Sequence, residues 1–190
     1  MRRFRNGDSI SYVTDNNAWY TNNSTAQCCA YQNDQAYVPA HGLLYSVAVL
    51  QDPRGACPAG WHPATDEDWK QLETHLGVAA SELDSLTLPG PFGAWRGGNE
   101  NVGGQLKALI TWDGPNTGAN NSSGFNAFAS GERTYLGNFI GMGEVASFWA
   151  AYPAQWLRKL SYLEHGSFRY HNGMGSDQSG YGHSCRCVKD

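Results

Sequence analysis

The chain has 190 residues, a length typical of one domain, and its 13 Lys and Arg against 17 Asp and Glu give a formal net charge of −4 at pH 7. A nucleic-acid-binding protein needs a basic face to displace counterions from phosphate, so this charge argues against nucleic acid as a partner. Charged residues make up only 16% of the chain while 13% are aromatic and 23 residues are glycine, so we expect turns and aromatic packing rather than long charged helices.

The first residues of the chain are basic, but no apolar stretch follows them, so we expect no secretory signal there. The longest apolar run, around residues 43–50, is far shorter than the roughly 20 residues that cross a bilayer. We therefore expect no membrane insertion. The residues themselves leave the export route, the localisation and the oligomeric state open.

One helix is clearly predicted, over residues 66–76. Thr65 is placed to cap its first turn, and Asp68 occupies the position from which an acidic side chain caps in return. Apolar residues then recur at helical spacing until a helix-ending glycine, at Trp69, Leu72, Leu76 and Gly77. A weaker helix is predicted over residues 42–50, and residues 79–88 are predicted to add a short third turn.

Beyond residue 89 the sequence changes to Gly, Asn, Ser and aromatic residues with frequent turn signals, which predicts short strands and long loops. Strands are predicted at residues 125–128, 147–151, 156–163, 168–171 and 184–188. Residues 164–167 have the composition of a hairpin loop. Helices followed by an irregular antiparallel sheet indicate an α+β fold, and because no repeat or linker divides the chain, we expect a single domain over residues 1–190.

The residues offer little support for a metal or cofactor site. The six histidines do not fall into a zinc-binding spacing, so no zinc site is predicted. The loop over residues 113–121 carries the oxygen-rich side chains that Ca²⁺ prefers, but it lacks the full register of a calcium-binding loop. A calcium site and an ordinary turn both stay open there, and no other cofactor is expected.

Five cysteines cannot all pair within one chain, and the sequence leaves open whether one disulfide forms. The pairs Cys28–Cys29 and Cys185–Cys187 lack the spacing and the cluster of basic residues that lower a thiol pKa, so buried structural thiols are favoured over redox chemistry. His62 has no evident partner for acid–base work. No nucleophile elbow, P-loop or dinucleotide fingerprint occurs, and we therefore expect no enzyme and no catalytic residues.

The segment from residue 148 to 181 is rich in Trp, Tyr and Phe interleaved with Gly, Ser, His and Asn. Alternation along a strand sends only half of such side chains to each face, so some are expected in the core and the rest exposed. Exposed aromatic, His and Asn side chains combine large contact area with hydrogen bonding. This composition is typical of a recognition surface.

Several ordered motifs make the chain recognisable as a whole. They include Asp52-Pro53-Arg54-Gly55, Cys57-Pro58-x-Gly60-Trp61-His62, the Asp68-Trp69 pair in the predicted helix, and the ending Arg186-Cys187-Val188-Lys189-Asp190. Together they resemble the Fibrobacter succinogenes major paralogous domain (FISUMP) family over nearly the whole chain. Two residues of the last segment depart from the family pattern, His183 where an aromatic residue is usual and Cys185 where an aliphatic one is usual.

The resemblance implies a C-type-lectin-like fold related to the formylglycine-generating-enzyme type, with two helices packed on a small twisted antiparallel sheet and long irregular loops. It implies a ligand-binding protein, receptor-like or adhesin-like, rather than an enzyme, on a cell surface, secreted or associated with a virion. Its partner would be a protein or glycan on another cell or particle. The scaffold side chains expected to be mostly buried are Trp61, Trp69, Leu72, Leu106, Trp149 and Val188.

Some family members resemble the variable proteins of diversity-generating retroelements, whose C-terminal segment is diversified chiefly in Asn codons. This resemblance makes residues 148–183 the candidate variable and ligand-binding segment here. The residues expected to contact ligand are Tyr152, Trp156, Leu157, Tyr162, His165, Phe168, Tyr170, His171, Asn172 and Asp177. Most of them are reachable by changing the first two bases of an Asn codon, whereas Trp156 and Lys159 are not. The alternatives are a fixed-sequence surface or structural module and a cysteine- or metal-dependent oxidase on the same fold.

Overall fold

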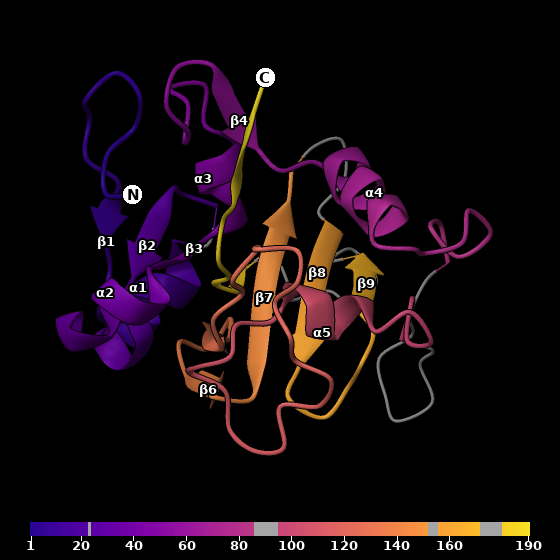
Figure 1. Ribbon diagram of the computed structural model, residues 1–190. Helices are drawn as coiled ribbons and strands as arrows, with labels where there is room; N and C mark the ends of the chain where they lie inside the picture. Colours follow the sequence, from indigo (N-terminus) through magenta and orange to yellow (C-terminus); the bar gives the residue numbers. More distant parts are fainter. Residues whose placement is uncertain (23, 86–94, 152–155, 172–179) are drawn as a thin grey trace.

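The computed structural model describes residues 1–22, 24–85, 95–151, 156–171 and 180–190 (Figure 1). The chain mixes short helices with several small sheets, which confirms the predicted α+β class. None of the helices in these ranges combines the length and apolar character needed to cross a bilayer.

The N-terminal part forms a unit of short elements around a three-stranded sheet in the order β1-β2-β3 (Figure 1). Its elements are β1 (Ser11–Tyr12), α1 (Asn16–Thr21), β2 (Gln27–Cys29), the 3-10 turns η1 (Tyr31–Asn33) and η2 (Gln35–Tyr37), α2 (Val38–His41), β3 (Leu44–Tyr45) and α3 (Val47–Gln51). Strand β1 pairs in parallel with β2, which pairs antiparallel with β3. This sheet was not predicted from the sequence.

The rest of the chain builds a five-stranded sheet and a two-stranded ribbon. The elements are β4 (Trp61–Pro63), α4 (Asp66–His75), α5 (Val102–Leu106), β5 (Ser130–Arg133), β6 (Phe139–Met142), β7 (Val145–Ala150), β8 (Trp156–Ser161), β9 (Phe168–His171) and β10 (Cys187–Lys189). The five strands run in the order β6-β5-β7-β8-β9, and β10 pairs with β4. Because β5 and β7 pair in parallel, the sheet is mixed rather than wholly antiparallel, which corrects the expectation.

Helix α4 forms where the sequence predicts it. The Thr65 hydroxyl accepts a hydrogen bond from the Asp68 backbone N–H, and the Asp68 carboxylate accepts one from the Thr65 N–H, which completes the capping box. Three acidic residues in the first turn also face the positive end of the helix dipole. These local signals explain why the helix begins at Asp66.

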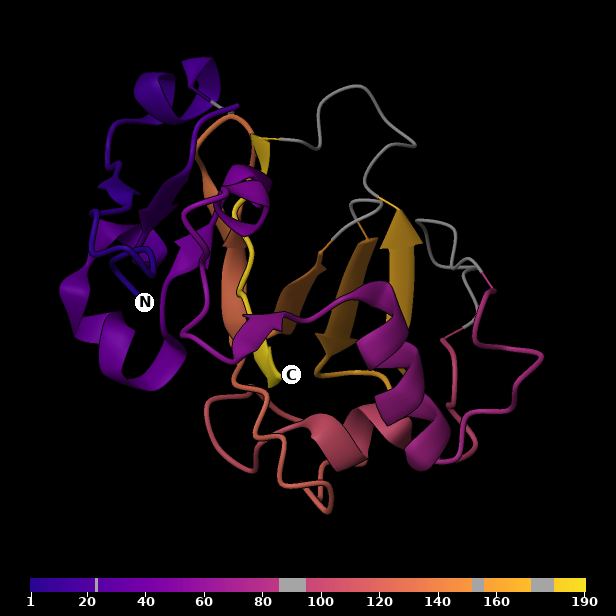
Figure 2. The same cartoon turned by 90° about the horizontal axis from the view of Figure 1, so that it is seen from above.

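Helices α4 and α5 lie on one face of the five-stranded sheet (Figure 2). Trp69 of α4 packs on Phe148 of β7, with ring centroids 5.5 Å apart, and Leu106 of α5 and Leu160 of β8 join the same core cluster. Trp69, Leu106 and Trp149 are buried as predicted. Leu72 and Val188 are only partly buried and pack at the margin of the cluster.

Two buried carboxylates tie α4 to the sheet. Glu73 has no exposed surface, and it accepts hydrogen bonds from Arg158 of β8, from Arg96 and from the Ser167 hydroxyl. The carboxylate of Asp66, at the start of the helix, accepts hydrogen bonds from both Nε and Nη2 of Arg169 of β9, at 2.9 and 2.6 Å. A buried carboxylate needs such partners because an unpaired one is costly to desolvate.

The C-terminal segment joins the two parts of the fold. Residues 182–184 bridge in turn to Arg133 of β5, Tyr45 of β3 and Phe148 of β7. The chain then runs on to β10 beside β4 (Figure 1). The predicted strand over 184–188 is therefore shorter and later, at Cys187–Lys189.

Two other predicted elements are wrong in part. The helix expected over 42–50 is confined to α3, because Leu44 and Tyr45 pair instead with Cys29 and Cys28 of β2. Residues 125–128 form no strand, and only Ala127 makes an isolated bridge, to Lys107. Phe125 packs against Trp69 rather than joining a sheet. Of residues 79–88, the described part, 79–85, holds turns only.

Candidate functional site

The second face of the five-stranded sheet carries the candidate site. Alternation along β8 places Leu157 and Lys159 on the side opposite the core residue Leu160. The register sets Tyr170 of β9 opposite Leu157 and Phe168 opposite Lys159. Side chains from neighbouring strands therefore meet on this face, away from α4 and α5.

These side chains line an open pocket of about 410 Å³, called here the sheet-face pocket. Its walls are mostly apolar or aromatic, formed by Trp95, Ile140, Val145, Leu157, Phe168, Tyr170 and Tyr181. Its polar lining comes from Glu132, Ser147, Lys159, Ser161 and His183. An apolar cavity with a few convergent polar groups is the usual form of a small-ligand site, and this volume lies within the usual range of about 300–1,000 Å³.

An ion pair lies at the base of this pocket. The Lys159 Nζ atom lies 2.5 Å from Oε1 of Glu132, and the Ser147 hydroxyl donates to the same oxygen at 2.7 Å. The Glu132 side chain is only 6% exposed, whereas that of Lys159 is 34% exposed. Burial raises the pKa of the Glu132 carboxyl, but His183, Lys159 and Ser147 more than offset this, so its pKa is lowered and it stays ionised at neutral pH.

His183 is a second buried polar group of the pocket. It is only 2% exposed, and its Nδ1 atom has no hydrogen-bond partner among the described residues. Its ring lies edge-on to Trp149 and stacks on Tyr181, with centroids 4.6 and 5.7 Å away. Burial lowers the pKa of His183 to about 4, so the ring is neutral at pH 7.

The structure gathers three of the sequence-predicted ligand residues in this pocket, namely Leu157, Phe168 and Tyr170. Leu157 and Tyr170 are each only 7% exposed, and Phe168 is partly exposed. Trp156 lies on the other face, where the Arg169 guanidinium sits 3.5 Å from its ring centroid. The pocket thus uses one face of β8 and β9.

Two further predicted residues, Tyr162 and His165, lie in the β8–β9 connection. The Tyr162 carbonyl accepts a hydrogen bond from the Thr117 N–H, and His165 Nδ1 lies 3.1 Å from Oδ1 of Asn101. They therefore contact the loops beside α5 and do not line the pocket. Tyr152, Asn172 and Asp177 lie outside the described residues, and His171 is the last residue of β9.

The loop that suggested calcium is held by a lysine of the chain itself. The buried Lys107 donates from Nζ to the carbonyl oxygens of Thr117, Ser161 and Glu164 at 2.7, 2.9 and 2.9 Å. Its ammonium group uses its three N–H donors on these three carbonyls. Lys107 thereby ties the loop over 113–121 to the β8–β9 connection.

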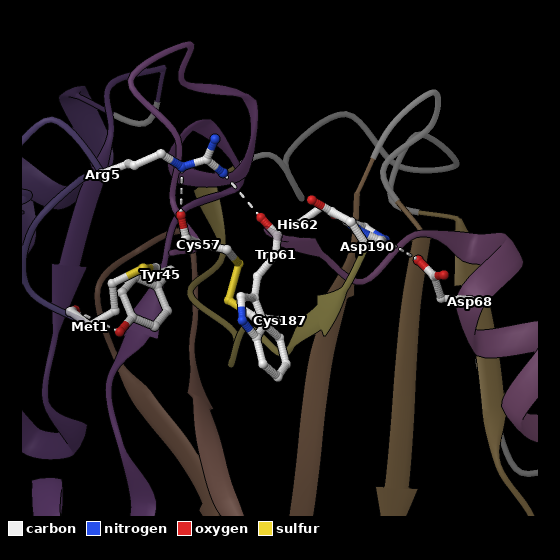
Figure 3. The surroundings of a disulfide bond; sticks show 9 residues. All are labelled: Met1, Arg5, Tyr45, Cys57, Trp61, His62, Asp68, Cys187 and Asp190. Carbon is white, nitrogen blue, oxygen red and sulfur yellow. Dashed lines mark hydrogen bonds and ion pairs between the residues drawn. A yellow bond between two sulfur atoms is a disulfide. The ribbon is translucent and has the colours of Figure 1, made fainter. Parts of the chain in front are cut away.

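The chain forms one disulfide among its described residues, between Cys57 and Cys187 (Figure 3). The Cys185 sulfur lies close to both, since the three sulfur atoms are within 4.8 Å of one another. Burial raises the pKa of the Cys185 thiol to about 12, so this thiol is protonated at neutral pH. The thiolate is the nucleophile and the metal ligand, and this environment opposes its formation.

The ribbon of β4 and β10 beside the disulfide contains two residues that the sequence placed differently. Trp61 was expected in the core but is 40% exposed, because its backbone rather than its ring is anchored, through a hydrogen bond from Arg5 to its carbonyl (Figure 3). His62, expected to lack a titratable partner, lies between Asp190 and Asp68 at 2.6 and 3.0 Å. These carboxylates raise its pKa.

Sequence reasoning missed Glu132 and His183 as pocket residues and noted Lys159 only as a residue that altered Asn codons do not reach. Glu132 comes from β5 and His183 from the C-terminal segment, so the topology alone brings them to β8. The one available signal was His183 itself, which stands where the resemblance leads one to expect an aromatic residue.

Comparison with protein-family models matches residues 1–189 to one described as the Fibrobacter succinogenes major domain. No curated protein and no solved structure matches the chain.

Proposed function

The chain belongs to the Fibrobacter succinogenes major domain family, whose model matches residues 1–189, and we propose that it is a non-enzymatic binding protein that holds its ligand on the outer face of the five-stranded sheet. One observation carries this proposal: three residues singled out from the sequence for ligand contact, Leu157, Phe168 and Tyr170, line a single pocket. We further propose that the scaffold is C-type-lectin-like, with the partner a protein or glycan on another cell or particle.

The aromatic side chains around the pocket suit this role. Phe168 and Tyr181 are partly exposed and Ile140 is 46% exposed, so apolar surface is available beside the polar base. Partly exposed aromatic side chains that bury on contact supply a large share of binding energy at low entropic cost. Such a surface holds a ligand by packing and hydrogen bonds without covalent chemistry.

We also propose that the pocket combines constant and diversified positions. Leu157, Phe168 and Tyr170 are residue types that altered Asn codons reach, whereas Glu132 and Lys159 are types that they do not reach. In this proposal the Glu132–Lys159 ion pair is the same in every gene copy, and the side chains around it vary from one copy to another. Trp156 is partly buried against the core and is also unreachable, so it would stay constant with the core.

Population sequencing tests the diversification. We expect substitutions within residues 148–183 to concentrate at positions 157, 168 and 170, at adenine-derived codons, with Glu132, Lys159 and Arg186-Cys187-Val188 constant. Uniform drift along the chain, or an invariant segment, contradicts it and leaves a fixed surface module.

A binding experiment tests the site itself. Labelled wild-type protein is applied to arrays of glycans and of purified surface proteins, together with the variants Phe168→Ala and Tyr20→Ala. Tyr20 is a matched control, since it is also aromatic, is 50% exposed and lies in α1 outside the pocket. We expect Phe168→Ala to lose the wild-type signals by about tenfold or more and Tyr20→Ala to keep them. Equal signals for wild type and Phe168→Ala contradict a binding role for this pocket.

A further inference from the structure

The polar atoms at the base of the sheet-face pocket are only partly satisfied by the protein. The ammonium group of Lys159 has three N–H donors, and its single ionic contact among the described residues is with Oε1 of Glu132. The Ser147 hydroxyl donates its hydrogen bond to that same oxygen. No hydrogen bond from a described residue reaches the other carboxylate oxygen of Glu132, Oε2. The buried Nδ1 of His183 also lacks a partner there.

The polar atoms of the pocket that have bonding capacity left define what a ligand must offer. Lys159 can donate further hydrogen bonds, so the ligand needs an acceptor. Glu132 can accept a further hydrogen bond, so the ligand also needs a donor nearby. Since the two side chains are in contact, the donor and the acceptor must lie side by side on the ligand.

The charge of the pocket restricts the ligand further. Glu132 and Lys159 cancel each other, and the remaining lining residues are uncharged when His183 is neutral. A ligand carboxylate would compete with Glu132 for Lys159, and a ligand cation would compete with Lys159 for Glu132. Either would leave one charge of a largely buried pair uncompensated, which is costly.

The walls add a shape requirement. The rings of Phe168 and Tyr170 stack at 29°, with centroids 6.0 Å apart, and Tyr181 and Ile140 complete the apolar lining. Aromatic and aliphatic walls of this kind favour a ring that packs against them.

We propose that the sheet-face pocket binds a neutral ring that carries a hydrogen-bond donor and an acceptor side by side, as in an aromatic carboxamide or a ring with two neighbouring hydroxyls. This rests on the proposed function, in that it names the ligand chemistry of the same pocket. The ligand's acceptor takes a hydrogen bond from Lys159, and its donor gives one to Glu132 or to His183.

A series of ring compounds that differ in one group tests this chemistry at pH 7. Benzamide offers a donor and an acceptor without charge, benzoate only acceptors with a negative charge, and benzamidinium only donors with a positive charge. Dissociation constants come from NMR titration of the wild-type protein. We expect benzamide to bind about tenfold or more tightly than either charged analogue. cis-1,2-Cyclohexanediol distinguishes a hydroxyl pair from a carboxamide as the better fit.

Benzoate or benzamidinium binding as tightly as benzamide overturns the proposal. So does the absence of measurable binding by both benzamide and the diol. Either result leaves the proposed binding function standing if the array signals still depend on Phe168. If Phe168→Ala leaves the array signals intact, the proposed function fails whichever compound binds.

Two variants add a direct test of the charge argument. Glu132→Gln leaves Lys159 uncompensated, so we expect the preference to move about tenfold toward benzoate. Lys159→Gln leaves Glu132 uncompensated, and we expect the preference to move toward benzamidinium. Lys159 is the more exposed partner, so its variant keeps the test available if Glu132→Gln does not fold. Leu109→Ala, at a residue 67% exposed outside the pocket, is the control and should keep the wild-type preference. Unchanged preferences in a folded Lys159→Gln variant overturn the proposal.

Discussion

Arg158 of β8 donates a hydrogen bond from Nε to Oε1 of Glu73 of α4 over 3.0 Å, and the side chains of both residues are at least 99% buried. The pair joins the one well-predicted helix to the strand that carries Leu157 and Lys159 on its other face. The position of the sheet-face pocket therefore depends on a charge contact within the core.

Removing that charge should destabilise the fold strongly. Glu73→Gln leaves Arg158 and Arg96 without their shared carboxylate, and breaking a buried ion pair typically costs about 3–5 kcal/mol. Urea denaturation followed by circular dichroism measures the free energy of unfolding. Glu67→Gln, at an exposed position of the same helix, should change it by less than about 0.5 kcal/mol. Equal effects of the two substitutions contradict the structural role of Glu73.

Removing the ammonium group of Lys107 should also lower the free energy of unfolding, because this group holds the loops beside α5. Lys107→Met keeps the length of the side chain but leaves the carbonyls of Thr117, Ser161 and Glu164 without this donor. The Ser161 carbonyl keeps a hydrogen bond from the Glu164 N–H, and each of the other two carbonyls costs about 1–3 kcal/mol when left unsatisfied, so we expect a loss of about 2 kcal/mol or more. Hydrogen exchange of the Thr117 amide should also become faster. Lys189→Met, at an exposed residue, serves as the control.

The contact of His62 with two carboxylates predicts a pH dependence of stability. Hydrogen bonds from His62 to Asp190 and then to Asp68 raise its folded pKa, so the charged form stabilises the fold fully below the ordinary His pKa of about 6.5. This contribution is lost as the pH rises through the higher folded pKa. Because the side chain is 36% exposed, solvent screening limits the effect to about 0.5 kcal/mol.

Unfolding free energies of the wild type and of His62→Gln between pH 5 and 9 measure this contribution. The wild type should be the more stable at the acid end, and the difference should shrink as the pH rises. A difference that grows with pH has the opposite sign and contradicts the protonated bridge.

The three free thiols should resist alkylation in the folded protein. Burial raises the pKa of Cys28 to about 11 and those of Cys29 and Cys185 to about 12. At pH 8 the thiolate fraction of each is then about one part in a thousand or less. Mass spectrometry after iodoacetamide treatment should show no modification before denaturation and three afterwards. Ser81→Cys supplies an exposed thiol as a positive control. Rapid labelling of Cys185 in the native state contradicts the raised pKa of its thiol.

How far the sequence predicts this structure depends on whether the signal is local. The capping box at Thr65 and Asp68 and the apolar spacing of α4 act within a few residues, and the helix lies where they predict it. Strands β7, β8 and β9 are likewise predicted by short patterns of aromatic residues and turns. By contrast, Leu44 and Tyr45 look helical but form a strand, because pairing with β2 outweighs their local preference.

The candidate site likewise contains some residues that local sequence patterns predict and others that they do not. Period-two alternation along β8 and β9 is enough to place Leu157, Phe168 and Tyr170 on one face. It gives no indication of Glu132 or His183, which come from distant segments and reach the pocket only through the order of strands. Charged residues that pair inside a fold have no periodic pattern, so Glu73 and its arginines were also missed.

The C-terminal segment has a consequence for how the protein is made. Its bridges run to β3, β5 and β7, and Cys187 is joined to Cys57 across 130 positions of sequence. Residues 182–190 are synthesised after all the elements that they bring together. Neither the disulfide nor the ribbon of β4 and β10 can therefore form during most of translation. Long-range contacts of this kind slow folding, because a large loop must close before they form. The nascent chain therefore lacks the bridges of residues 182–184 and the Cys57–Cys187 bond until synthesis has passed residue 187, whereas the neighbouring strands β7, β8 and β9 can already pair.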